Sequence, residues 1–111
     1  MQRRDGSAEV VSHAILRLVA DLPGEAGRIR AARIVGGYSV AYRTDGDMER
    51  FAKYAVGDVD WSLRELTALV DALIAGGLVA QVPPPRPTLV LTRAGHRALD
   101  ALEGTTTRRD G

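Results

Sequence analysis

The chain has no cysteine, a single lysine and no long apolar run. The absence of cysteine excludes disulfides and thiolate metal sites. No stretch of 18 apolar residues exists, so the sequence predicts no membrane span. The polar residues 1–7 lack the apolar segment of a secretory signal. We therefore expect a cytoplasmic protein, and 111 residues suit one domain with its own core.

Motifs for catalysis and for metal binding are also missing. His13 and His96 have no partner at the spacing of a metal site or a catalytic triad. The sequence shows no glycine-rich phosphate loop, no paired carboxylates and no nucleophile motif. It predicts no enzyme, no cofactor, no metal and no small-molecule substrate.

The charges are segregated along the chain, although the net charge is only +1. Residues 26–44 and 80–99 contain arginines and no acidic residue. The acidic residues between these two blocks lie within residues 45–72. Arginine's planar fork suits phosphate. The alternative source of the excess of arginine over lysine is a GC-rich genome, which would account for most of that ratio but not for the segregation.

The second half of the chain predicts the back half of a winged helix. Ser62 and Glu65 form a capping box, and Trp61 and Leu66 have the spacing of a hydrophobic staple. An amphipathic helix follows and ends at Gly76-Gly77. A short strand, a proline-rich tip over residues 82–88, a second strand and a helix capped by Thr92 complete the pattern. The expected fold is mostly α with a small β wing.

Three further helices precede this half. The first runs from a cap at Ser7 to about Leu22, the second from about Gly27 to Val35, and the third from Asp47 to Ala55, capped by Asp45 or Asp47. We expect Ile29, Ala32 and Val35 to be buried in the second, and Met48, Phe51, Ala52 and Ala55 in the third. In the first helix the apolar residues recur at helical spacing and form one stripe: Val10, Val11, Ala14, Ile15, Leu18, Val19 and Leu22. A turn is expected at residues 57–60. The predicted domain covers residues 7–103, between a flexible segment 1–6 and a disordered tail 104–111.

The second predicted helix and the loop after it form the candidate binding site. Arg30 and Arg33 share a face because they lie three residues apart, and Arg28 lies in the first turn. Tyr38, Tyr42 and Arg43 follow. Basic and aromatic residues together suit phosphate contact with base stacking. The alternative is a solvated helix whose tyrosines belong to the core.

The wing tip and the helix before the wing give weaker signals. Prolines stiffen the tip, and Arg86 there could reach a groove or a phosphate; the alternative is a hairpin that blocks edge pairing. The outward face of the helix before the wing is poorly suited to a polyanion, because it carries two acidic residues, Glu65 and Asp71, and one basic residue, Arg64. Several of its other outward residues are alanines. In helix-turn-helix proteins the corresponding helix is the main reader of bases. We do not expect that role for this helix.

These segments together resemble the RecQ C-terminal (RQC) domain, the winged helix that follows the motor of RecQ-type DNA helicases. The similar pieces are Ile15-Leu16 with Val19, Ile34-Val35-Gly36-Gly37, Tyr54-Ala55-Val56-Gly57, Leu66 through Leu78, and Leu89-Val90-Leu91-Thr92-Arg93-Ala94-Gly95. They cover residues 15–99, and their order and spacing favour RQC over other winged helices.

The resemblance implies contact with duplex DNA through the end of the second helix, the loop after it and the wing. This agrees with the basic segment and the wing arginine described above, and the predicted DNA-binding residues are Arg28, Arg30, Arg33, Gly37, Tyr38, Ser39, Tyr42, Arg43 and Arg86. The chain departs from the family in three respects. Val35 replaces the arginine of the family's frequent Arg-Gly-Ser, the wing tip has no aromatic residue, and the motor and zinc module are missing. A stand-alone module or a fragment of a larger protein fits this pattern.

The sequence thus predicts a non-catalytic module that binds duplex or forked DNA mainly through phosphates. Two alternatives remain open. One is a winged-helix transcriptional regulator, which would form a homodimer on a palindrome. The other is a winged helix that binds only a protein partner.

Overall fold

The structure, a computed structural model, describes residues 3–57, 61–83, 85 and 87–107. These form five α-helices, two short 3₁₀ helices and one two-stranded antiparallel sheet. This is the mostly helical, winged-helix-like layout that the sequence predicts. Among the helices of the described residues, none combines the length and apolar character needed to cross a membrane.

The first helix, α1 (Arg3–Asp21), is the central helix of the core. Val11, Ile15, Leu18 and Val19 are buried as expected, and Leu16 is buried with them. Two details differ from the expectation. The helix begins four residues before Ser7, so Ser7 lies inside it rather than at its cap, and Val10 is 52% exposed.

The second helix, α2 (Arg28–Val35), ends in a Schellman motif. Gly37 has φ +77°, the Gly37 N–H donates to Ile34, and the Tyr38 N–H donates to Arg33. Its buried residues are Ala31, Ala32, Ile34 and Val35. The expectation that Ile29 faces inward was wrong, since that side chain is 39% exposed, because α2 turns its Ala31/Ile34/Val35 side to the core.

The segment after α2 folds as 3₁₀ helix η1 (Ser39–Ala41), helix α3 (Asp45–Phe51) and 3₁₀ helix η2 (Ala52–Tyr54). Thr44 is the residue at the N-cap of α3, in place of the expected Asp45 or Asp47. Phe51 is buried as predicted, but Met48 is 56% exposed and Ala52 is also exposed. So short a helix buries few positions, and its periodicity is a weak guide. Most of the expected turn, residues 58–60, lies outside the described residues.

Helix α4 (Leu63–Ala75) begins and ends where the sequence predicts. The Ser62 Oγ accepts a hydrogen bond from the Glu65 N–H at 3.1 Å, and the Ser62 N–H donates to Glu65 Oε1 at 2.8 Å. Leu66, Val70 and Leu73 are buried, and Trp61 packs against the same core. A Schellman motif closes the helix, with the Leu78 N–H donating to the Leu73 carbonyl.

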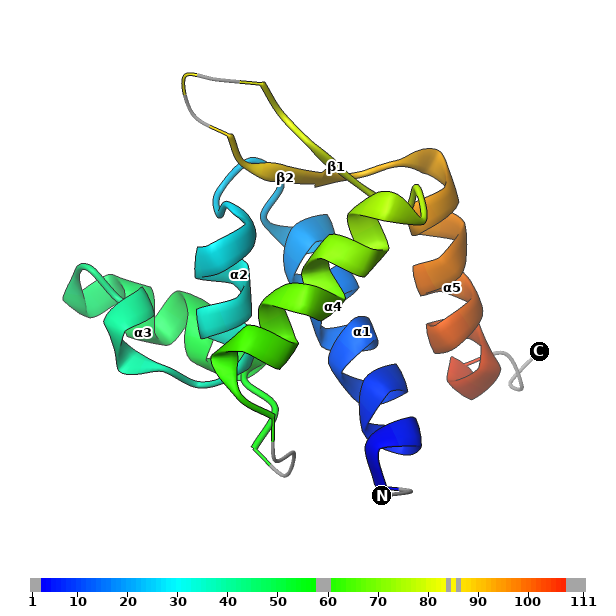
Figure 1. The fold of residues 1–111 in the computed structure, drawn as a ribbon, viewed down its shortest axis with the longest axis horizontal. Coiled ribbons are helices and arrows are strands. Elements are labelled where there is room, and N and C mark those ends of the chain that lie inside the picture. The colour runs from blue at the N-terminus through cyan, green and yellow to red at the C-terminus, as the bar shows by residue number, and fades with distance from the viewer. Residues whose placement is uncertain (1–2, 58–60, 84, 86, 108–111) are drawn as a thin grey trace.

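The wing consists of β1 (Val79–Gln81) and β2 (Leu89–Leu91), paired in antiparallel register with Val79 opposite Leu91. Strand β2 is also hydrogen-bonded to the segment before α2. The Gly24 N–H donates to the Leu89 carbonyl, and the Leu89 N–H donates to the Ala26 carbonyl. This pairing fixes the wing beside the first turn of α2, as Figure 1 shows at the top of the molecule.

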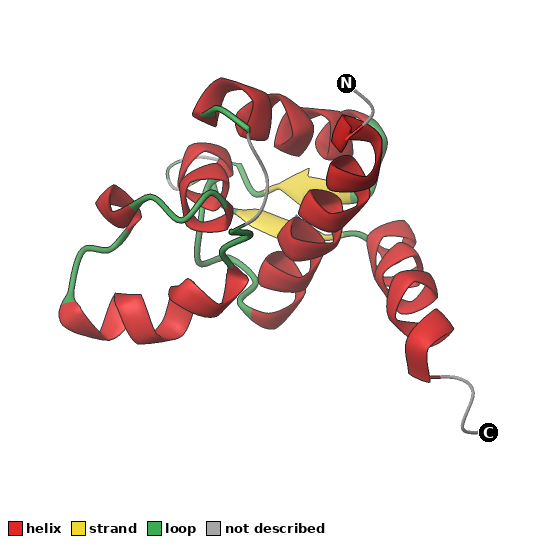
Figure 2. Cartoon of the chain, turned by 90° about the horizontal axis from the view of Figure 1, so that it is seen from below, coloured by secondary structure: helices red, strands yellow, loops and turns green. Residues whose placement is uncertain are grey.

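Helix α5 (Arg93–Thr107) is capped by Thr92, whose Oγ1 accepts from the Gly95 N–H at 2.9 Å. It runs to Thr107, past the predicted end near Glu103, so residues 104–107 are helical rather than part of a disordered tail. In Figure 2 the last turns of α5 extend beyond the body formed by the other helices. The helix packs mainly against α1.

Candidate nucleic-acid interface

A groove of about 640 Å³ separates the first turns of α2 from the wing. Four arginines line it, Arg28, Arg30, Arg33 and Arg43, together with wing residues Gln81, Pro85, Pro87 and Thr88. Glu25 is the acidic residue of this lining, and its carboxylate accepts from Arg50 at 2.9 Å. The arginines of the acid-free segment are therefore brought together on one surface, which we call the α2–wing groove.

The four arginines are not equivalent, and Arg28 is paired with a carboxylate. Its Nε donates to Asp71 Oδ1 at 2.7 Å and its Nη2 to Oδ2 at 2.8 Å. Asp71 lies on α4, so the pair links α2 to the helix before the wing. Each partner lowers the energy of the other's charged form: the pKa of Asp71 lies below its ordinary value because of the Arg28 hydrogen bonds.

Arg30 serves the fold rather than the surface. Its Nε donates to the Ala41 carbonyl and its Nη2 to Asp47 Oδ2, both at 3.0 Å. The guanidinium carbon lies 4.9 Å from the centre of the Phe51 ring, and the side chain is only 16% exposed. Arg30 thereby holds η1 and α3 against α2.

The carboxylate of Asp47 completes this arrangement. It accepts from the backbone N–H of Arg43 at 2.8 Å and from that of Thr44 at 3.3 Å. These backbone hydrogen bonds, the Arg43 one above all, lower the pKa of Asp47. The loop before α3 is thus fastened at its backbone, and the Arg43 side chain remains exposed.

Arg33 and Arg43 are the two groove arginines whose side chains are not used in this way. The Arg33 Nε is buried and has no hydrogen-bond partner among the described residues. Within the same residues, no carboxylate forms an ion pair with the guanidinium of Arg33 or of Arg43. A buried polar group without a partner costs stability. Arg33 therefore has hydrogen-bonding capacity that the described residues do not satisfy.

The sequence allows two roles for the two tyrosines, stacking against bases or packing in the core. Tyr38 and Tyr42 are both half-buried and pack against the core. The Tyr38 ring packs closely against Gly36, where a Cβ would lie 2.6 Å from the ring and from Leu66. Their core contacts favour a structural role. Gly37 and Ser39 are exposed in the same loop, and Arg86 lies outside the described residues.

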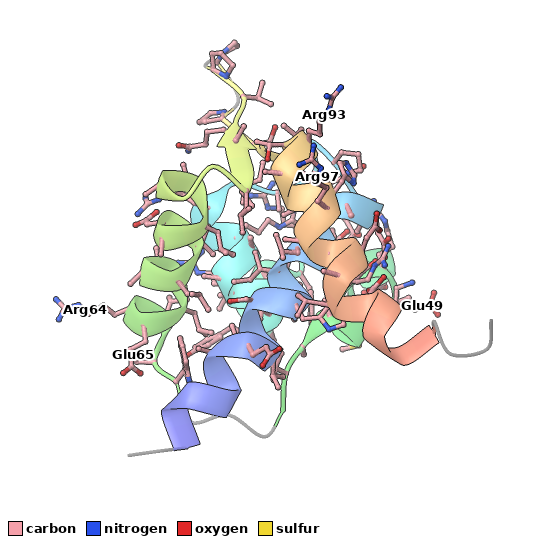
Figure 3. All side chains as sticks on the ribbon, turned by 90° about the vertical axis from the view of Figure 1, so that its right-hand side faces the viewer. Glu49, Arg64, Glu65, Arg93 and Arg97 are labelled. Atoms are coloured by element: carbon pink, nitrogen blue, oxygen red, sulfur yellow. The ribbon has the colours of Figure 1, made fainter. Side chains whose placement is uncertain are left out.

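The outward face of α4 consists mostly of small side chains and carries few charges. Ala68, Ala72 and Ala75 are exposed, Asp71 is paired with Arg28, and the Thr67 hydroxyl donates to the Leu63 carbonyl within the helix. Arg64 is a cation that projects from this helix, as Figure 3 shows. This face offers few groups of the kind that read base edges.

A second polar cluster, which the sequence did not predict, joins α1 to α5 and η2. It contains His13, Arg17, Asp21, Tyr54 and Glu103, and we call it the α1–α5 seam. Arg17 donates from Nη1 to Glu103 at 2.5 Å and from Nη2 to Asp21 at 2.7 Å. His13 lies 2.8 Å from Glu103, and the Tyr54 hydroxyl donates to Asp21 at 2.8 Å.

The contacts of the seam shift the pKa values of Glu103, Asp21 and Tyr54. Hydrogen bonds from His13 and Arg17 lower the pKa of Glu103, and those from Arg17 and Tyr54 lower that of Asp21. Burial, followed by the bond to Asp21, raises the pKa of Tyr54 to about 12. No local motif marks this cluster, because His13 and Glu103 are 90 residues apart in sequence.

Within the described residues, no three histidine, aspartate or glutamate side chains gather as they would around a metal ion. Comparison with known proteins adds no assignment: no family model, curated protein or solved structure matches the chain.

Proposed function

We propose that this protein is a non-catalytic, RQC-like DNA-binding module that holds duplex or forked DNA by its phosphates through the α2–wing groove. The observation that carries the proposal is that Arg33 and Arg43 line this groove beside the wing, next to Arg28 and Arg30, and that the acidic lining residue Glu25 is paired with Arg50. Such a role agrees with the cytoplasmic location that we expect from the sequence.

The local backbone supports an anion in this groove. The first turn of α2 contains no acidic residue, and its N-cap, Gly27, supplies no side-chain acceptor. Helix N-termini carry unpaired N–H groups and a partial positive charge. Gly27 and the residues of that turn line the groove together with the arginines, so the dipole and the side chains favour the same charge.

The structure narrows which arginines would make phosphate contacts. Arg30 is occupied by Asp47, Ala41 and Phe51, and Arg28 by Asp71. We therefore assign direct contact to Arg33 and Arg43, and a supporting role to Arg30. Binding of this kind is salt-dependent and weakly sequence-specific, because phosphate contacts carry little sequence information.

A transcriptional regulator is the less favoured function. It needs a helix that reads base edges, and α4 presents alanines and an occupied aspartate. A module that binds only a protein partner predicts no affinity for DNA even at low salt, so the same experiment separates it from the lead proposal.

The experiment is a binding titration with blunt duplex, forked and single-stranded DNA of equal length at two salt concentrations. We expect duplex or forked DNA to bind, and the affinity to fall steeply as salt rises. Absence of binding at low salt would reject both DNA-binding functions.

A further inference from the structure

Arg28 lies between two surfaces of the protein. It lines the α2–wing groove, and it also lines a second, shallower groove between α2 and α4, together with Ile29, Leu63, Arg64, Thr67 and Asp71. In Figure 1, α2 and α4 lie side by side, and these two helices are in extensive contact. The direction in which Arg28 points therefore decides which of the two grooves its charge serves.

Asp71 directs Arg28 to the α4 side. The two hydrogen bonds of 2.7 and 2.8 Å are the bidentate arrangement that arginine also makes with a phosphate. Both side chains remain partly accessible, with exposed fractions of 38% for Arg28 and 46% for Asp71. The carboxylate thus occupies Arg28 as a phosphate would, at a position that solvent and ligands can reach.

From this geometry we infer that Asp71 determines which arginines contact DNA: it withholds Arg28 from the phosphate backbone and keeps that backbone away from α4. The inference rests on the proposed function of the α2–wing groove. It explains why a helix in the position of a recognition helix carries an acid on its outward side. The backbone would be confined to Arg33, Arg43 and the wing.

The test is the substitution Asp71→Asn, which removes the charge and keeps the shape. Released from its partner, Arg28 should make one more phosphate contact. We expect affinity for duplex DNA at low salt to rise about 2–5-fold, in line with the strength of an exposed ion pair. The slope of log K against log salt should steepen by about one. Asp100→Asn on α5 is the matched control, since Asp100 is exposed and lines neither groove.

A double-mutant cycle with Arg28→Ala distinguishes release of Arg28 from general loss of negative charge. Arg28→Ala alone should change the affinity little, and Asp71→Asn should have less than half its effect in the Arg28→Ala background. Equal effects in both backgrounds, or an equal gain from Asp100→Asn, would overturn the inference while leaving the proposed function intact. Failure of the wild-type protein and of Asp71→Asn to bind DNA at low salt would overturn both.

Discussion

The α1–α5 seam and the α2–wing groove use arginine in opposite ways. In the seam, Arg17 is matched by Asp21 and Glu103, and every charge has an internal partner. In the groove, Arg33 and Arg43 pair with no carboxylate of the described residues, and Glu25 is drawn off by Arg50. The seam links structural elements, whereas the arginines of the groove without a carboxylate partner are the ones to which we assign the proposed phosphate contacts. Matching of charge, rather than its mere presence, separates the two roles.

Arg30 lines the groove, but its side chain contacts Ala41, Asp47 and Phe51 inside the protein. It therefore tests whether a groove arginine with internal partners has a structural role. Arg30→Ala should lower the free energy of unfolding by about 2–3 kcal/mol, since it removes two hydrogen bonds and leaves Asp47 without its cation. Urea denaturation measures the loss.

Arg33→Ala is the matched control for this prediction, since it lies one turn along the same helix. It should cost well under 1 kcal/mol, because among the described residues its Nε makes no hydrogen bond that would be lost. Equal destabilisation by both substitutions would show that Arg33 is also structural, and would remove it from the proposed site.

The seam should be sensitive to substitution and to acid. Arg17→Met keeps much of the apolar stem and should cost about 1–2 kcal/mol, because hydrogen bonds between charged groups are lost but are screened by solvent. DNA affinity of the folded variant should be unchanged. A parallel loss of affinity would mean that the seam and the groove are coupled.

The pH dependence follows from the lowered carboxylate pKa values. Asp21 and Glu103 titrate below their ordinary values of 3.8 and 4.5, so their contribution is present above those values and is lost as pH falls through the lower folded ones. Thermal melts should therefore show stability declining below about pH 4.5, and Glu103→Gln should flatten the decline. An identical acid profile for that variant would contradict the role of Glu103.

The cap of α4 tests the claim that this helix is structural. Ser62→Ala should cost roughly 1 kcal/mol of stability, because it removes the acceptor of the Glu65 N–H. Calorimetry measures this cost, and Ser12→Ala, inside α1, is a comparison serine without a capping role. A large loss of DNA affinity without a loss of stability would show that α4 contacts the DNA.

The smallest expected effect concerns base pairing at the DNA end. A wedge must repay the cost of unstacking, and aromatic side chains do so at about 1–3 kcal/mol per base. Residues 82–88 of the wing contain no aromatic residue. A fluorescent base analogue at the duplex terminus should therefore stay dim on binding. Brightening that Arg86→Ala abolishes would show that the wing opens the duplex.

The local motifs that follow were the reliable part of the sequence. The Ser62–Glu65 box, the helix ends at Gly36-Gly37 and Gly76-Gly77, and the cap at Thr92 depend on neighbours within a few residues, and the structure confirms them. The mostly α fold with a β wing follows from their order.

The caps predicted at Ser7 and at Asp45 or Asp47 were wrong, and so was the end of the last helix near Glu103. Other errors came from short helices and from distant partners. Ile29 and Met48 were assigned to the core because a helix of seven or eight residues has too few turns to define a face. The partner of Arg28 lies 43 residues away on α4, and that of Arg30 lies 17 residues away. The sequence therefore indicated a basic segment, but only tertiary structure separates its occupied arginines from Arg33 and Arg43.

The most direct test of the central claim is a salt titration of duplex binding by the Arg33→Ala/Arg43→Ala double variant. Its comparison is Arg93→Ala/Arg97→Ala, which removes the same charge from the exposed side of α5 seen in Figure 3. The groove variant should lose about two from the log–log salt slope and on the order of tenfold in affinity, alike on unrelated sequences, with little change in the α5 variant. Equal losses in the two folded variants would contradict it, because binding would then depend on net charge and not on the α2–wing groove.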